Sequence, residues 1–424
     1  MLRICSRTDP DFETRLAALA RRTAELPAAV ETAAREVIAE VRAGGDAAVR
    51  AFTHRFEKRT LRALELSRTE WQAEADRVDP KVRRAIERAA ERVRAFHRRE
   101  LHPGFEMTEE GIRLGLRVTP LERVGLYVPG GTARYPSTVI MTAVPAKVAG
   151  VPEVVMVTPG PSPETLAAAL VAGVDRVFPI GGAQAIAALA YGTESIPRVD
   201  KIVGPGNAYV TAAKRLVYGD VGIDMIAGPT EVVIAADSTA HPALVAADLL
   251  AQAEHDPGSA VLITPSASLA AAVVSAVDVQ LPALERASAA RAALERYSAA
   301  VVTDSLDAAC DLASEIAAEH LQIITADDAR CLARIRHAGA IFLGPHTPVP
   351  LGDYFAGPSH VLPTGGTAKF FGPLSVNDFL KASSLIAYDA EAMAEDSAGV
   401  QDFANREGLT AHAAAAKVRS RQGG

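Results

Sequence analysis

The sequence predicts an α/β protein with two similar, doubly wound parallel-sheet domains, preceded by helices and followed by a helical C-terminal tail. From Val124 onward, short apolar runs alternate with helical patterns, which is typical of βαβ units. Aromatic residues make up only 5% of the chain and alanine is abundant, which favours helix-rich α/β packing over an all-β design. The 424 residues are enough for two or three domains, each with its own core.

The first 120 residues carry no recognisable chemistry. Residues 1–25 are predicted to form a polar arm. Residues 26–120 are predicted to be a helical segment that packs with residues 237–372 as one α/β domain. Its first helix should begin near Pro27 and end at Gly44-Gly45, a strong stop signal.

The alternation after residue 120 divides into two blocks and a tail. Residues 121–236 are predicted to form one sheet, with strands at 124–128, 153–157, 176–180 and 201–203 and a closing strand pair within 222–236. Residues 237–372 should supply the second sheet, with strands at 260–264, 299–303, 321–325 and 340–343. Residues 373–424 are predicted to form the helical tail.

Charge and composition exclude several classes of protein. Lys and Arg number 44 and Asp and Glu number 51, which gives a net charge of −7. The sequence contains no sustained run of basic residues, so we expect no nucleic-acid partner. No apolar run reaches about 18 residues, so no membrane span is expected. The 3 cysteines lie far apart, which suits a reducing compartment. We therefore expect a cytoplasmic protein.

A candidate metal site begins with Gln252 and His255. They stand three residues apart in a predicted helix over 248–255, so their side chains should project from one face. A helix end whose polar groups meet solvent is the alternative. The prediction of a divalent metal site depends on possible further ligands far downstream, Asp353 and His412.

Four glycine-rich loops should gather at the carboxyl edge of the first sheet, where open α/β sheets bind ligands: 127–131, 180–184, 203–207 and 227–231. Glycine lets the backbone approach a ligand, and the helix after each loop would point its positive end there, which suits phosphate. Tight turns are the alternative, and the loops contain no G-x-G-x-x-G fingerprint. Gln184 and Asn207 are stronger candidates because their amides can hydrogen-bond a ribose or an amide.

Glu319 and His320 are candidates for proton transfer. They lie at a predicted junction between helix and strand, where adjacent side chains should point in different directions and could serve two separate proton transfers. A solvated turn is the alternative. Asp353 and His360 fall in a long Gly- and Pro-rich loop, whose length is typical of functional or disordered segments.

Together these stretches resemble histidinol dehydrogenase over residues 25–415. The resemblance is carried by motifs in a fixed order along the chain: VGLYVPGG at 124–131, PAKVAG at 145–150, GPGN at 204–207, GPTE at 228–231, QAEH at 252–255, EH at 319–320, GDY at 352–354, SHVLPTGG at 359–366 and EGLTAH at 407–412. Single short motifs match by chance, whereas an ordered set of this size is specific.

The resemblance implies a homodimer with shared active sites that oxidises L-histidinol to L-histidine in two steps, using two NAD molecules, a water and one zinc ion per subunit. It implies that the tail reaches the partner subunit. The implied zinc ligands are Gln252, His255, Asp353 and His412, with His412 acting across the dimer. The implied NAD contacts in a Rossmann-like domain are Tyr127, Gln184 and Asn207. The implied substrate contacts are Thr230, Gln252, His255, His320, Asp353, His360, Glu407 and His412, and the implied proton acceptors are Glu319 and His320.

Two alternatives stay open. A relative with the same zinc and NAD apparatus could oxidise another small alcohol, such as a sulfonated diol, although His360 and Glu407 together with the Glu319-His320 pair favour an imidazole-bearing amino alcohol. A zinc-stapled binding protein without catalysis would have no need for Glu319 and His320. A thiol-based aldehyde dehydrogenase is disfavoured because Cys310 and Cys331 fall within predicted helices.

Overall fold

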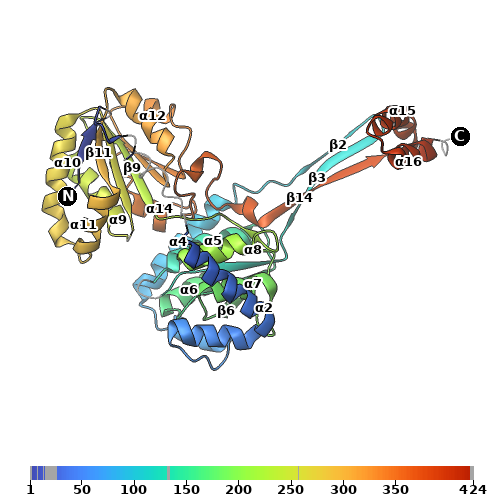
Figure 1. The fold of residues 1–424 in the computed structure, drawn as a ribbon, viewed down its shortest axis with the longest axis horizontal. Helices are drawn as coiled ribbons and strands as arrows, with labels where there is room; N and C mark the ends of the chain where they lie inside the picture. Colours follow the sequence, from blue (N-terminus) through green and yellow to red (C-terminus); the bar gives the residue numbers. More distant parts are fainter. Residues whose placement is uncertain are drawn as a thin grey trace. The chain divides into compact units, whose positions relative to one another are not determined.

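The computed structural model describes residues 2–6, 8–12, 14, 26–130, 134–255 and 257–420. Residues 15–25 of the predicted arm and Gly131 of the first glycine-rich loop lie outside the described residues. The chain divides into two compact units (Figure 1). Unit 1 comprises Met1–Glu100 and Glu122–Phe379, and unit 2 comprises Leu101–Leu121 and Leu380–Gly424.

Within the described part of unit 1, one parallel sheet has five strands in the order β6-β5-β4-β7-β8. The strands are β4 (Arg123–Tyr127), β5 (Glu153–Val157), β6 (Arg176–Phe178), β7 (Lys201–Val203) and β8 (Gly222–Ile223). The connecting helices are α5 (Pro136–Val148), α6 (Pro163–Ala172), α7 (Gly182–Tyr191) and α8 (Ala208–Val217). This alternation confirms the predicted doubly wound sheet. The strand order reverses between β4 and β7, the point at which such sheets bind ligands.

Helix α6 shows how local sequence sets these elements. The Ser162 hydroxyl accepts from the Thr165 N–H at 3.2 Å, and Pro163 occupies the first turn, where no N–H is needed. Gly173 ends the helix at φ 82°, a left-handed conformation that glycine adopts without steric cost. The alanine and leucine residues between these signals are mostly buried, so the helix can lie within the layer.

The N-terminal helices pack on this first sheet, and the prediction that they pack with residues 237–372 is wrong. They are α2 (Ala28–Glu57), α3 (Arg68–Ala75) and α4 (Pro80–His97). α7 is buried around most of its circumference, and α2 covers it with Val37, Val41 and Val49. The predicted helix end at Gly44-Gly45 is also wrong, because Gly45 takes φ 51° and kinks the helix, which resumes and ends at Glu57.

The second parallel sheet of unit 1 has six strands among the described residues, in the order β1-β11-β10-β9-β12-β13. The strands are β1 (Ile4–Ser6), β9 (Glu231–Ala236), β10 (Ser259–Thr264), β11 (Ala299–Val302), β12 (His320–Ile324) and β13 (Ala340–Leu343). Apolar side chains of α9 (Pro242–Ala253), α10 (Ala267–Gln280) and α11 (Ala287–Tyr297) cover one face. Those of α12 (Leu306–Ile316) and α13 (Asp328–Leu332) cover the other. The sheet is therefore doubly wound, as predicted.

Two strands of this sheet depart from the prediction. The sequence predicts that β9 closes the first sheet, but β9 pairs with β10 and β12 in the second. All of its residues are buried, which suits a central strand with parallel neighbours on both sides. β1, in the predicted polar arm, pairs with β11 at the sheet edge. The boundary between the sheets therefore falls before Glu231 and not at residue 236.

Unit 2 contains an antiparallel sheet in the order β14-β3-β2, followed by two helices, in the residues described. Its elements are β2 (Phe105–Glu109), β3 (Ile112–Pro120), β14 (Leu380–Tyr388), α15 (Ala390–Arg406) and α16 (Thr410–Ser420). Glu110 and Gly111 both have positive φ, as in the tight turn of a two-residue hairpin. The prediction of a helical segment up to residue 120 is therefore wrong at β2 and β3. The predicted helical tail contains α15 and α16 but begins with a strand, β14, that was not predicted.

The helices bear on two classes of protein that the sequence disfavours, membrane-spanning proteins and thiol-based aldehyde dehydrogenases. None of the helices in the described ranges combines the length and the apolar character of a membrane span. Cys310 and Cys331 are buried within α12 and α13, as predicted. Neither thiol lies in a glycine-rich loop, where a nucleophile of an aldehyde dehydrogenase would be expected.

Candidate functional site

A cavity of about 660 Å³ in unit 1 brings residues of both parallel sheets together. The first sheet contributes the start of α5 and the loop between β7 and α8. The second contributes residues before β9 and β12, the end of α9, and α14 (Val349–Tyr354). Eight of the predicted site residues line the cavity: Asn207, Thr230, Gln252, His255, Glu319, His320, Asp353 and His360.

The two sheets present opposite strand ends to this cavity. Pro129 follows β4 and Pro205 follows β7, so the first sheet contributes carboxyl ends, as predicted. Thr230 precedes β9 and Glu319 precedes β12, so the second sheet contributes amino ends. The loop 227–231 joins β8 of the first sheet to β9 of the second. Its residues 227–230 line this cavity with the residues that follow β4 and β7, so the loop lies at the carboxyl edge of the first sheet, as predicted.

Glu319 and His320 are neighbours in space at the start of β12. Ala317 ends α12 in a left-handed conformation, φ 55°, and both following side chains line the cavity instead of pointing apart as predicted. Glu319 Oε2 accepts from the Thr230 hydroxyl at 2.5 Å and from the Glu231 N–H at 3.0 Å. The same oxygen lies 3.5 Å from His320 Nδ1. The two candidate proton acceptors are therefore in contact.

The surroundings shift the pKa values of three touching groups. His320 Nδ1–H donates to the Glu231 carbonyl at 3.1 Å, and its Nε2 lies 3.7 Å from Asp353 Oδ1. Burial alone would lower the pKa of His320, but the carboxylates of Glu319 and Asp353 outweigh it and raise that pKa to about 9. Burial raises the pKa of Glu319. Although burial opposes it, the interaction with His320 lowers the pKa of Asp353. Such shifts are typical of functional sites.

Three candidate metal ligands line the same cavity. Gln252 lies in the last turn of α9, whereas His255 follows the helix end at Ala253, so the predicted shared helix face is wrong. The Gln252 amide nitrogen donates to Thr230 Oγ1 at 2.6 Å, which leaves the amide oxygen for a cation. Asp353 adds a carboxylate from α14.

This donor set fits zinc or a similar divalent ion. An amide oxygen, an imidazole and a carboxylate are ligands that such ions accept, and the C-terminal end of α9 adds partial negative charge. Within the described ranges, no group of three or more His, Cys, Asp or Glu side chains could hold a metal ion. The candidate set differs from such a group because one of its three members is the Gln252 amide.

His360 connects the two sides of the cavity. Its Nδ1–H donates to the Asp353 carbonyl at 3.0 Å, and its Nε2 lies 3.3 Å from the Thr138 hydroxyl on α5. Burial lowers the pKa of His360. The ring is therefore held neutral, and a neutral imidazole can hydrogen-bond a polar ligand without repelling a nearby cation.

The predicted cofactor residues lie around the carboxyl ends of β4, β6 and β7. The buried Tyr127 hydroxyl accepts from the Gly182 N–H at 3.1 Å, and burial raises the pKa of Tyr127 to about 12. Gln184 is 1% exposed, and its amide has no hydrogen-bond partner within the described part of the chain. Asn207 caps α8 by accepting from the Tyr209 N–H at 3.0 Å. A buried amide without a partner beside helix N-termini fits a polar, phosphate-bearing ligand.

Four predicted residues are not among the described residues that line the cavity. Tyr127 and Gln184 belong to unit 1 but are buried outside the lining. Glu407 caps the end of α15 and His412 lies in α16, so both belong to unit 2. Every described residue that lines the cavity belongs to unit 1. Unit 1 of a single chain therefore supplies three of the four predicted metal ligands.

Sequence reasoning missed Glu231, which contacts both candidate proton acceptors. Its N–H and its carbonyl bind the Glu319 carboxylate and the His320 ring, as described above. Its Oε1 accepts from the Gly365 N–H at 2.9 Å and from the Glu319 N–H at 3.3 Å. The sequence did contain a signal for this role. Glu231 directly follows Thr230 and begins an apolar run typical of a buried strand, and a buried carboxylate needs hydrogen-bond or ionic partners.

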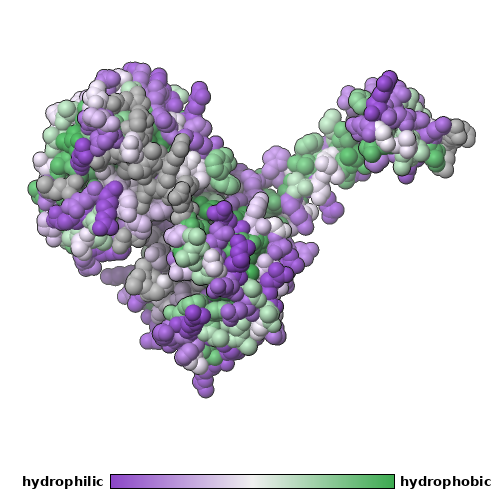
Figure 2. All heavy atoms as spheres, viewed as in Figure 1, coloured by the Kyte–Doolittle hydropathy of each residue, from purple (hydrophilic) through white to green (hydrophobic). Residues whose placement is uncertain are grey.

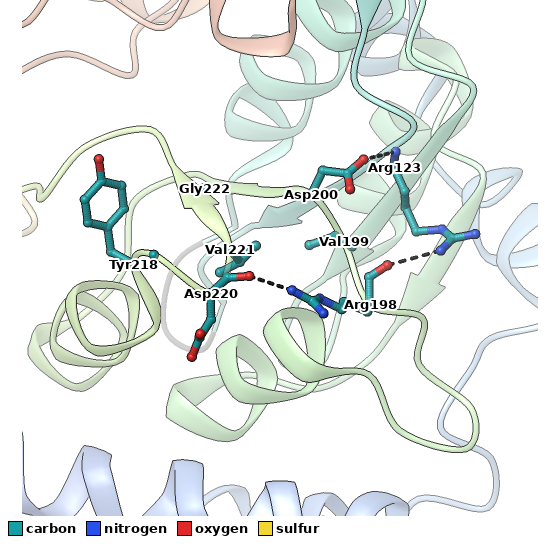
Figure 3. Close-up of a pocket in the computed structure, with 9 residues that line it drawn as sticks. Arg123, Arg198, Val199, Asp200, Tyr218, Asp220, Val221 and Gly222 are labelled. Atoms are coloured by element: carbon teal, nitrogen blue, oxygen red, sulfur yellow. Dashed lines mark hydrogen bonds between the residues drawn. The ribbon is translucent and has the colours of Figure 1, made fainter. Parts of the chain in front are cut away.

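A second cavity, of about 720 Å³, lies at the amino ends of β4, β7 and β8, where it is lined by Arg123, Arg198 and Asp220 among others (Figure 3). Arg123 Nη1 donates to the Arg198 carbonyl at 3.1 Å, and Arg198 Nη2 donates to the Asp220 carbonyl at 2.7 Å. It contains none of the predicted site residues, and its two guanidinium groups already bind the protein. The first cavity is therefore the candidate active site.

Comparisons with known proteins agree over nearly the whole length of the chain. The family model described as histidinol dehydrogenase matches residues 20–420. The histidinol dehydrogenase of Aquifex aeolicus is 50% identical over 414 residues, covering 97% of each chain. That of Syntrophotalea carbinolica is 49% identical and covers 99% of each chain. A crystal structure of histidinol dehydrogenase from Elizabethkingia anophelis superposes with a TM-score of 0.94 at 32% identity, covering 99% of this chain and 98% of that one. The chain therefore belongs to the histidinol dehydrogenase family of oxidoreductases.

Proposed function

We propose that this protein oxidises L-histidinol to L-histidine through L-histidinaldehyde, the last steps of histidine biosynthesis. One alcohol, two NAD⁺ and one water would give one carboxylate, two NADH and three protons. The substrate follows from the name that the relatives share. The observation that supports the chemistry best is that two proton acceptors, three metal-type ligands and a candidate cofactor loop line one cavity.

His320 is suited to the alcohol step. The bond from Nδ1–H to the Glu231 carbonyl fixes the ring and leaves Nε2 to take the hydroxyl proton as hydride leaves for NAD⁺. Nε2 is buried and has no hydrogen-bond partner among the described residues. The charge of Asp353 helps to raise the pKa of His320, so engaging Asp353 with a cation would return His320 toward a neutral, proton-accepting form.

Glu319 is suited to the aldehyde step. It would take a proton from the water that adds to the aldehyde carbon, and the hydrate would then lose a second hydride to the second NAD⁺. The Thr230 hydroxyl and the Glu231 N–H hold Oε2, which leaves Oε1 to face the water. The raised pKa of Glu319, caused by burial, makes its carboxylate a stronger base than an exposed one.

Gln252, His255 and Asp353 would hold a zinc ion together with His412 of the partner subunit. When bound, zinc would position the substrate through its imidazole and amino nitrogens. Thr230 and His360 would contact the same substrate from either side of the cavity. Tyr127, Gln184 and Asn207 would contact NAD.

A homodimer would complete each site, because zinc commonly takes four ligands and unit 1 supplies three. Unit 2 would carry His412 and the substrate contact Glu407 to the partner subunit. Unit 2 exposes large apolar side chains, including Ile386 at 69% and Phe403 at 77%, and Figure 2 shows hydrophobic residues on its visible face. Such surfaces are commonly covered by a protein partner.

The proposal is tested by counting NADH formed per L-histidinol consumed by purified, zinc-loaded protein. We expect a ratio near two, and we expect a chelator to abolish turnover and added zinc to restore it. A ratio near one would remove the second oxidation. No turnover by a folded protein that binds zinc and NAD would point to another small alcohol as substrate.

A further inference from the structure

A buried ion pair lies beneath the loop that joins β7 to α8. Lys214 on α8 and Asp224, directly after β8, contact each other through Nζ and Oδ1, and their side chains are only 3% and 1% exposed. Burying two charges usually stabilises a fold no better than an apolar pair of similar size. Stability alone therefore does not account for this pair.

The pair holds both polar groups of one glycine. Lys214 Nζ donates to the Gly204 carbonyl at 2.9 Å, and the Gly204 N–H donates to Asp224 Oδ2 at 2.7 Å. Asp224 Oδ1 also accepts from the Met225 N–H at 2.7 Å. Because the two peptide planes that flank Gly204 are each tied to a buried charge, neither can rotate without breaking a charge-assisted hydrogen bond.

Gly204 sits where the loop must approach β4. Its φ is 111°, and a Cβ built there would lie 2.2 Å from the Tyr127 carbonyl oxygen, so only glycine fits. From Gly204 the chain passes through Pro205 to Asn207, and both of these residues line the candidate active site. The conformation of Gly204 thus sets how the loop enters the cavity.

We propose that Lys214 and Asp224 are positioning residues that hold the loop 204–207 in the shape that receives NAD. This inference rests on the proposed function, because it takes NAD as the ligand of the loop. A loop that already has its bound shape loses little conformational freedom when the ligand arrives. Neither residue is among the described residues that line the cavity, and both bind the loop at Gly204, so both would act through Gly204.

The test compares two double variants by calorimetric titration with NAD. Either single substitution would leave a buried charge without its partner, so Lys214→Met and Asp224→Asn are combined. The control, Arg123→Met with Glu153→Gln, removes a partly exposed ion pair of 2.5 Å at the opposite, amino ends of β4 and β5. We expect NAD to bind about tenfold more weakly to the first variant, as for a loop that has its binding shape about a tenth of the time. The control should bind NAD like the wild type.

Two further readouts separate positioning from a general loss of structure. At saturating NAD the kcat of the first variant should stay within about twofold of the wild type, because the proton acceptors lie on the other sheet. In the ligand-free protein, amide hydrogens of residues 204–210 should exchange faster in this variant, and those of residues 154–157 should not.

The outcomes distinguish this inference from the proposed function. A wild-type protein that binds no NAD would overturn the proposed function. A wild-type protein that binds NAD, with a variant of equal affinity and equal exchange in the loop, would overturn only the positioning role of Lys214 and Asp224.

Discussion

The two parallel sheets of unit 1 face one cavity with opposite polarity. The five-stranded sheet presents the carboxyl ends of β4 and β7 and the N-terminal ends of α5 and α8. The six-stranded sheet presents the amino ends of β9 and β12 and the C-terminal end of α9. Helix N-termini carry partial positive charge and helix C-termini partial negative charge. The helix termini of the five-stranded sheet therefore suit the phosphates of a dinucleotide, and those of the six-stranded sheet suit a cation. This difference arises from the backbone and does not depend on the side chains.

The comparison also shows why similar sheets can serve different chemistry. On the first side, the candidate cofactor residues lie at the end of β4, in α7 and at the cap of α8, and Gly204 lets the loop before α8 pass close to the Tyr127 carbonyl. On the second, the amino ends of β9 and β12 place carboxylates and imidazoles side by side, where they shift one another's pKa values. We therefore expect substitutions on the two sides to affect different measured quantities.

The largest effect is expected from the proposed metal ligands of the six-stranded side. His255→Ala or Asp353→Ala should remove zinc and reduce activity. Substituting a residue that only orients a metal ligand typically reduces activity by up to about 100-fold, and we expect a larger loss here because the ligand itself is removed. NAD affinity should be unchanged, because its loops lie on the other sheet. Metal analysis and NAD titration of the same sample check both statements. His241→Ala, at the opposite end of α9, serves as control. Near-normal activity in a metal-free variant would contradict the site.

Glu319→Gln should have the next largest effect, on the order of 10²- to 10⁴-fold, because it would remove the proposed general base. The aldehyde step should suffer more than the alcohol step. Supplying L-histidinaldehyde and L-histidinol in separate assays measures the two steps. An equal loss in both would remove Glu319 from the water-activating role.

Glu231→Met, which has no oxygen to accept these hydrogen bonds, should lower kcat by about tenfold to 100-fold, the scale of a misplaced catalytic group. The reason is that its carboxylate holds the Glu319 N–H and the Gly365 N–H at the edge of the cavity. The KM for NAD should not change. A variant with an unchanged kcat, or one that changes only the KM for NAD, would show that Glu231 does not orient the proton acceptors.

Asn207 offers a smaller test of the five-stranded side. Asn207→Ala should weaken NAD binding by about tenfold through a lost hydrogen bond and should destabilise the fold by about 1 kcal/mol through the lost helix cap. Asn207→Asp keeps an oxygen that can cap α8 but brings negative charge near the cofactor. It should therefore lose NAD affinity without losing stability. Equal melting temperatures and equal NAD affinities in all three proteins would remove Asn207 from the cofactor site.

The smallest expected signal concerns the shared site. Inactive His412→Ala subunits mixed with inactive His255→Ala subunits should recover about a quarter of wild-type activity. Half of the randomly formed dimers would be mixed, and each mixed dimer would hold one intact site of two. Each variant unfolded and refolded alone is the control. No recovery in mixtures shown to contain mixed dimers would argue against His412 acting across subunits.

Local sequence signals predicted individual elements better than their partners. The strands β5 and β7 fall at the predicted residues, 153–157 and 201–203, because short apolar runs between turn residues are local signals. The sheet to which β9 belongs depends on which strands flank it, and its pattern of buried residues suits the centre of either sheet. β2 is exposed along its whole length, and its apolar–polar alternation covers only residues 105–108, the shortest run of the roughly four to eight residues that mark a half-buried strand.

The sequence likewise predicted which residues form the site better than it predicted their contacts. The motifs identified residues that line one cavity, but the contact between Glu319 and His320 depends on the left-handed turn at Ala317, a conformation unusual for alanine. Glu231 stood within a motif already recognised, yet its role depends on β9 lying beside β12, and the sequence pattern alone does not determine that pairing.

The most direct test of this division of labour is a calorimetric titration of metal-free protein with NAD and, separately, with L-histidinol. We predict that NAD binds with an affinity within about threefold of that for the zinc-loaded protein, as expected for separate sites. L-Histidinol should bind only after zinc is restored. Loss of NAD binding on removing zinc, or tight histidinol binding without zinc, would contradict the assignment of cofactor and metal to opposite sheets.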